Sequence, residues 1–159
     1  MPSGAVHFKF WKFGWIPTIG ATTYLFYLNH PVEACGVMLG YGLGALIDPD
    51  LDIMGTSNAE SRMVNKIPVA GHLFYGLSSV YGSIFRKHHR SFWTHTPIVS
   101  TAIRILFFFW WIGIFYWKGW IIYEDWHLVL FLGIFAGLSF ADFLHWFADS
   151  LPKRLTRRR

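Results

Sequence analysis

Long runs without charged side chains constrain this chain more than any other feature. Residues 13–32 contain no Asp, Glu, Lys or Arg, and residues 97–117 contain only Arg104. A third uncharged run covers residues 126–141. A helix needs about 20 mostly apolar residues to cross the hydrocarbon core of a bilayer. The three runs therefore predict membrane-spanning helices.

A shorter uncharged run, residues 34–47, carries Gly36, Gly40 and Gly44 at intervals of four. Small residues at this spacing let membrane helices pack closely, so we count the run as a further span. Charged residues make up 14% of the chain, against about 25% in an average soluble domain. The sequence thus predicts an all-α, polytopic membrane helix bundle of about four transmembrane helices, formed as a single domain over residues 1–159.

The distribution of Lys and Arg orients this bundle, because short cytoplasmic loops collect basic residues. Twelve basic residues fall in the segment before the first run, in the connection 48–96 and in the tail 153–159, whereas Lys118 is alone on the opposite side. We therefore expect a multi-pass protein of a bacterial inner membrane with both termini cytoplasmic. The basic tail would contact anionic lipid headgroups. No reader motif accompanies it, so nucleic acid is not an expected partner.

Residues 67–85 are also uncharged but are rich in Gly and Ser. This segment could span the membrane or lie against it. A span would place Arg86, Lys87 and Arg90 on the outer side, so four spans with an interfacial or re-entrant helical segment fit the charge distribution better.

The second span is followed by the acidic motif DPDLD, residues 48–52. Pro49 disfavours helical geometry at Asp48, so the helix should end there and the chain should run extended. In an extended chain, Asp50 and Asp52 point to the same side and could offer two oxygen ligands to a metal. The alternative is an ordinary acidic turn.

The segment before the third span reads RKHHRSFWTH, residues 86–95. His89 and His95 are candidate metal ligands, with hydroxyl groups nearby. Alternatively, the segment is a basic interfacial loop that contacts lipid headgroups, a role that suits Arg90.

The last uncharged run is followed by Asp142, His145 and Asp149, which share one helical face at positions i, i+3 and i+7. Ionisable groups at a membrane edge are costly to bury without partners, which indicates a functional site. A polar stripe that binds another helix is the alternative. Arg104, inside the third span, could pair with these carboxylates, hold an anionic group of a substrate, or extend to the headgroups.

The motifs MPSGAVH, PDLDI and HRSFWTHTPI, in this order, resemble a family of uncharacterised bacterial membrane proteins labelled as metal-binding. More distantly, the chain is similar to LexA-regulated inner-membrane metal-dependent hydrolases. The resemblance covers essentially the whole chain. It implies seven metal ligands, which are His7, Asp50, Asp52, His89, His95, His145 and Asp149.

Seven donors exceed what one ion with open positions would use, so we expect two adjacent divalent transition-metal ions. Mixed imidazole and carboxylate ligation suits Zn, Mn or Fe. If the protein is an enzyme, a metal-activated water would hydrolyse an ester or phosphoester, with a lipid-derived substrate, and Arg90, Arg104 and Asp142 would support the reaction. A non-catalytic structural metalloprotein or a metal-handling membrane protein is the alternative.

Overall fold

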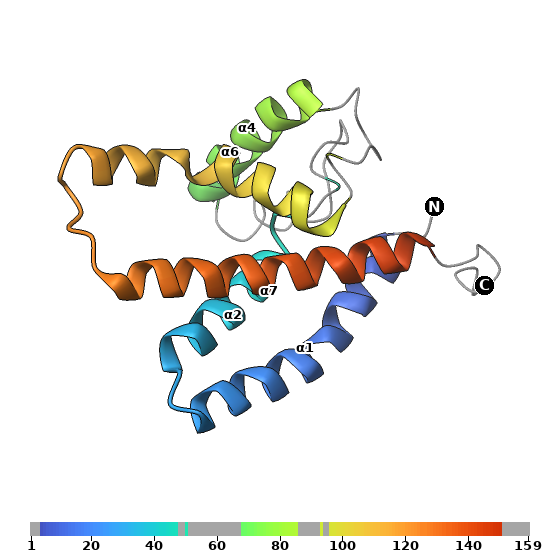
Figure 1. The fold of residues 1–159 in the computed structure, drawn as a ribbon. Helices are drawn as coiled ribbons and strands as arrows, with labels where there is room; N and C mark the ends of the chain where they lie inside the picture. The colour runs from blue at the N-terminus through green and yellow to red at the C-terminus, as the bar shows by residue number, and fades with distance from the viewer. Residues whose placement is uncertain (1–3, 48–49, 51–67, 86–92, 94–95, 151–159) are drawn as a thin grey trace.

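The computed structural model describes residues 4–47, 50, 68–85, 93 and 96–150, and within these ranges it contains five α-helices and no β-strand. The helices are α1 (Gly4–Tyr27), α2 (Pro31–Leu43), α4 (Pro68–Phe85), α6 (Pro97–Trp117) and α7 (Asp125–Ser150). Helix α7 lies between α6 on one side and the α1–α2 pair on the other (Figure 1). The all-α expectation is confirmed for the described part of the chain.

Proline residues and left-handed backbone positions set the helix boundaries. Helices α2, α4 and α6 each begin at a proline, whose fixed φ suits the first helical position and whose missing N–H costs nothing there. Asn29 adopts a φ of 61° between α1 and α2, and Gly119 adopts 70° after α6. A left-handed residue of this kind stops a helix and reverses the chain.

Two of the expected spans have different boundaries in the structure. The run 13–32 is not one helix, because α1 ends at Tyr27 and Asn29 turns the chain before α2 begins at Pro31. The run 34–47 is helical only to Leu43, four residues short of the expected end. The expected third span is α6 with the same limits, while α7 extends the fourth to Ser150.

Only α6 and α7, among the helices that the structure describes, are long and apolar enough to cross a membrane. The 13 residues of α2 span about 20 Å, which is less than the hydrocarbon core of about 30 Å. The structure thus supports two spanning helices and does not support the expected four.

Helices α2 and α7 form the most extensive interface between described elements, and glycine residues line it. A Cβ atom added to Gly36 would lie 2.6 Å from the carbonyl oxygen of Leu130, and one added to Gly40 would collide with the backbone of Ile134. On the facing helix, Gly133 and Gly137 are equally close to the α2 backbone. The close packing predicted from the glycine spacing is confirmed, with α7 as the partner.

Helix α1 packs on this pair through Tyr41, which is completely buried. The Tyr41 hydroxyl donates a hydrogen bond to the Trp11 carbonyl, and Trp11 Nε1 donates to the Tyr41 carbonyl at 3.2 Å. These reciprocal bonds join α1 to α2 at a fixed register.

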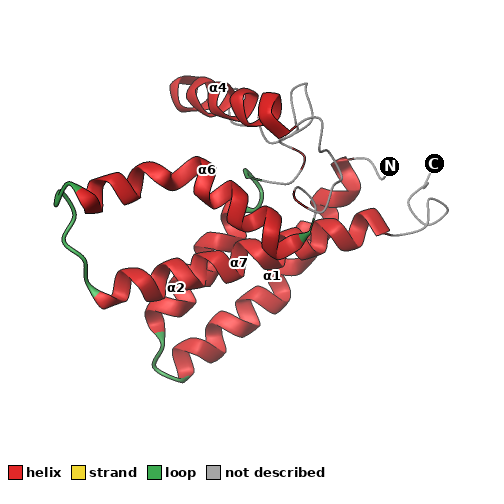
Figure 2. Cartoon of the chain, turned by 45° about the horizontal axis from the view of Figure 1, so that its top comes forward, coloured by secondary structure: helices red, strands yellow, loops and turns green. Residues whose placement is uncertain are grey.

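Helix α4 lies next to α6 and away from α1 (Figure 2). Aromatic side chains connect α4 and α6, since Phe74 stacks on Phe108 at 6.0 Å and Tyr81 meets Phe107 at 5.2 Å. Ile47 joins the same apolar cluster from the segment that follows α2. This cluster fixes the chain just before the acidic motif.

The α1–α2 and α6–α7 turns lie at one end of the bundle, and the C-terminal end of α7 lies at the other (Figure 1). The polar residues of interest gather at this end.

Candidate functional site

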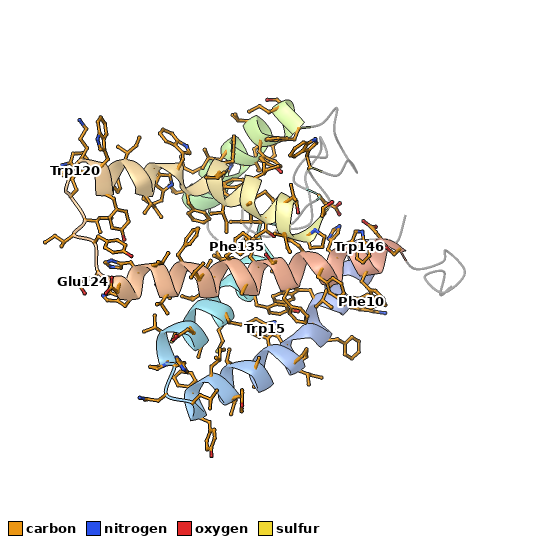
Figure 3. The ribbon with its side chains drawn as sticks, viewed as in Figure 1. Phe10, Trp15, Trp120, Glu124, Phe135 and Trp146 are labelled. Carbon is orange, nitrogen blue, oxygen red and sulfur yellow. The ribbon has the colours of Figure 1, made fainter. Side chains whose placement is uncertain are left out.

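The last three turns of α7 carry three ionisable residues at one end of the bundle, Asp142, His145 and Asp149. Trp146, the neighbour of His145 in the chain, marks this end in Figure 3, whereas Trp120 and Glu124 mark the opposite end. Asp142 and His145 are buried, and Asp149 is partly buried. The predicted shared face of these three residues is confirmed.

His145 lies between two carboxylates that come from different parts of the chain. Its Nε2 atom is 3.5 Å from Asp149 Oδ2, one helical turn away on α7, and 3.5 Å from Asp50 Oδ1, which follows α2. Ordinary N–H···O hydrogen bonds are about 2.7 to 3.2 Å long. Both carboxylates thus lie just beyond hydrogen-bonding distance from the same nitrogen.

This spacing can be compared with that of ligands on one metal ion. Two donors each about 2.1 Å from a zinc ion, at a tetrahedral angle, are about 3.4 Å apart. The separations of 3.5 Å are close to this value, and imidazole nitrogen with carboxylate oxygen is a common ligand set for divalent transition metals. Even so, within the described ranges no group of three or more His, Cys, Asp or Glu side chains has the arrangement of a metal site. We call His145, Asp50 and Asp149 the partial donor set, after the imidazole nitrogen and the carboxylate oxygens that they bring together.

A second polar group, centred on Arg104, lies next to this donor set. Arg104 has no exposed surface, and Asp142 has 2%. The Arg104 Nη2 atom donates to Asp142 Oδ2, and the Thr101 hydroxyl donates to the same oxygen. Arg104 Nη1 donates to the Ile47 carbonyl. One guanidinium thereby joins α6, α7 and the segment after α2.

Of the three roles considered for Arg104, the structure shows the pairing with a carboxylate. A guanidinium that extended to the headgroups would have an exposed tip, and this one has none. Its remaining bonds are internal to α6, from Nε to the Ser100 carbonyl at 3.2 Å and from Nη2 to the Ser100 hydroxyl at 3.4 Å.

The structure brings together Asp50, His145 and Asp149 from the predicted ligands, and Arg104 with Asp142 from the supporting residues. The predicted residues Asp52, His89, Arg90 and His95 lie outside the described residues. His7 falls within α1, but its side chain is not among those described.

Three members of the Arg104 group were not predicted. Ser100 and Thr101 lie four and three residues before Arg104, on the same helical face, so the 3.6-residue period could have identified them. The carbonyl group of Ile47 has no signature in the sequence, because every residue carries one.

Comparison with known proteins gives one match. A family profile described as "Uncharacterized metal-binding protein (DUF2227)" matches residues 2–159, which is almost the entire chain. No curated protein and no solved structure matches this chain.

Proposed function

The chain belongs to this family of uncharacterised metal-binding proteins, and from that premise we propose that it binds divalent transition-metal ions where His145 meets Asp50 and Asp149. The observation that carries the proposal is the position of His145 Nε2, at 3.5 Å from carboxylates of two separate elements. One imidazole nitrogen and two carboxylates at this spacing offer the mixed nitrogen and oxygen ligands that divalent transition metals bind.

We assign the remaining ligands from the resemblance to the family. They are His7, Asp52, His89 and His95, which would complete the partial donor set. Two adjacent ions use seven donors and still leave positions for water or substrate. Zn, Mn and Fe all suit this mixture of imidazole and carboxylate.

Metal analysis of the full-length chain, purified in detergent with and without added metal, tests the proposal. We expect about two ions per chain for the wild type and a loss of metal in His145→Ala, Asp50→Asn and His89→Ala. The matched control is His127→Ala, at the opposite end of α7, which should keep the wild-type metal content. A folded wild-type protein that takes up no Zn, Mn or Fe would contradict the proposal.

We further propose that the bound ions serve the hydrolysis of an ester or phosphoester, as the resemblance to inner-membrane metal-dependent hydrolases implies. When bound, such ions supply Lewis acidity and a nucleophile near neutral pH. The chain's own residues would hold them and orient the substrate. We assign anion binding to Arg90 alone, because the donors of Arg104 are occupied inside the bundle. The test is metal-dependent release of nitrophenol from nitrophenyl phosphodiesters and esters, lost in His145→Ala.

A structural metal site is the second candidate, and one observation favours it. Asp50 follows α2 whereas His145 and Asp149 belong to α7, so a bound ion would cross-link two elements. Structural sites are coordinatively closed, whereas catalytic sites keep an open position. Metal that raises the melting temperature while nitrophenyl substrates remain intact would favour the structural role.

We propose that the protein is integrated in a membrane, with α6 and α7 as spanning helices. Support comes from the large apolar side chains exposed along these helices, such as Leu106, Trp110 and Leu132. The finer scheme places the protein in a bacterial inner membrane with both termini cytoplasmic, and it rests on the distribution of Lys and Arg. The metal site would then face the cytoplasmic headgroups, where a lipid-derived substrate is accessible.

A further inference from the structure

Arg104 differs from every other basic residue that the structure describes, because it is completely buried in the helix bundle. A charged group at this depth is costly unless it is paired and hydrogen-bonded. Its pairing with Asp142 compensates the charge. The pairing does not explain why a second branch of the guanidinium binds the Ile47 carbonyl.

Arg104 binds two groups, the Ile47 carbonyl and the Asp142 carboxylate. Each of them lies the same number of residues before one part of the donor set, which consists of Asp50 on one segment and His145 with Asp149 on α7. Ile47 lies three residues before Asp50, and Asp142 lies three residues before His145. One rigid, planar group thus holds the chain immediately upstream of each part. Without it, no described hydrogen bond joins Ile47 to α7.

From this arrangement we infer that Arg104 is the positioning residue of the metal site, setting the distance between the Asp50 arm and the His145–Asp149 face. The inference rests on the proposed function. Arg104 is not itself among the proposed ligands. It acts by holding the backbone at Ile47 against the carboxylate of Asp142, and Thr101 donates a second hydrogen bond to the same carboxylate oxygen.

The planarity of the guanidinium is essential to this role. Its fixed fork can donate to two acceptors in different directions at once, whereas the ammonium group of lysine is a single point charge. Arg104→Lys should therefore keep the buried charge pair and lose the bond to Ile47. Residues that orient metal ligands typically affect metal affinity by about 10- to 100-fold.

Titration of the full-length protein with Co²⁺, followed by visible absorption, tests the inference. We expect Arg104→Lys to weaken Co²⁺ binding by about 10- to 100-fold and to change the absorption spectrum, with the melting temperature of the metal-free protein close to that of the wild type. A second variant, Arg104→Met with Asp142→Leu, removes the link without leaving a buried charge and should show the same loss.

Thr22→Val is the matched control, because Thr22 is buried in α1 and its hydroxyl bonds only within that helix. It should bind Co²⁺ like the wild type. Folded Arg104 variants that bind Co²⁺ with wild-type affinity and spectrum would overturn the inference about Arg104 and leave the proposed metal binding intact. A wild-type protein that binds no Co²⁺, Zn, Mn or Fe would overturn the proposed function, and the inference with it.

Discussion

Asp142 and Arg104 are both buried, so breaking their ion pair and replacing it have different consequences for stability. Removing one partner of a buried pair costs about 3 to 5 kcal/mol, because the other charge is left without compensation. Replacing both with apolar side chains of similar volume is often neutral. We therefore expect Asp142→Asn to lower the free energy of unfolding by about 3 kcal/mol, and Arg104→Met with Asp142→Leu to change it by less than about 1 kcal/mol.

Chemical denaturation in detergent, followed by circular dichroism, gives both values. Equal losses for the single and the double variant would show that the charge pair does not determine the packing of α6 against α7.

Tyr41 is a second residue whose role can be measured by itself. Its hydroxyl donates to the Trp11 carbonyl across the α1–α2 interface. Tyr41→Phe keeps the ring and removes one hydrogen bond, so we expect a loss of about 1 kcal/mol in the free energy of unfolding. Tyr24→Phe is the control, because Tyr24 is exposed and should change stability by less than about 0.5 kcal/mol. The melting temperatures of both variants check this prediction. If Tyr24→Phe lowered stability as much as Tyr41→Phe, the loss would not come from the hydrogen bond between Tyr41 and Trp11.

At the scale of helices, the α2–α7 interface depends on the absence of side chains at four glycines. A methyl group at Gly40 would collide with backbone atoms of Ile134, which cannot move without separating the helices. Overpacking of a tight contact costs about 1 to 3 kcal/mol, occasionally more. We expect Gly40→Ala to lower the free energy of unfolding by at least about 2 kcal/mol and to weaken metal binding, since α2 leads to Asp50.

Gly113 provides the matched control, because no atom lies within 4 Å of a Cβ placed there. Gly113→Ala should raise stability by about 0.5 to 1 kcal/mol, as alanine is the better helix former. If Gly40→Ala and Gly113→Ala changed the free energy of unfolding in the same direction, the close contact between α2 and α7 would not determine stability.

The elements also show which parts of the fold were predictable. The limits of α6 follow from Pro97 and from Lys118 and Gly119 after Trp117, so the predicted and observed helices coincide. The run 13–32 was misassigned, because uncharged sequence alone does not distinguish one helix from two. The signal for the turn was present at Asn29 and Pro31, whose preferences for left-handed and helix-starting positions are both local.

The candidate site was predictable only in part, for a physical reason. Asp142, His145 and Asp149 share a helical face by periodicity alone, so their grouping could be read from the sequence. The pairing of Arg104 with Asp142 joins residues 38 apart, and the approach of Asp50 to His145 depends on how two helices pack. Such contacts are set by tertiary structure, which no local pattern specifies.

At the scale of the whole molecule, the proposed membrane orientation makes a direct prediction about accessibility. Single cysteines at Lys12 and Tyr123, placed in a Cys35→Ser background, lie near opposite ends of the bundle. An impermeant maleimide added to intact cells should label Tyr123→Cys, whereas Lys12→Cys should react only after permeabilisation. Labelling of both positions in intact cells would contradict the orientation, and labelling of neither would contradict an exposed α6–α7 turn.

The glycine-lined contact between α2 and α7 also determines how the molecule can move. Most helix interfaces adjust by exchanging side-chain rotamers, which takes picoseconds to nanoseconds for exposed groups. Where backbone meets backbone there are no rotamers to exchange, so α2 and α7 should move as one rigid body. Movement of Ile47 relative to α7 must then come from bending in residues 44–46, between the end of α2 and the carbonyl group that Arg104 binds.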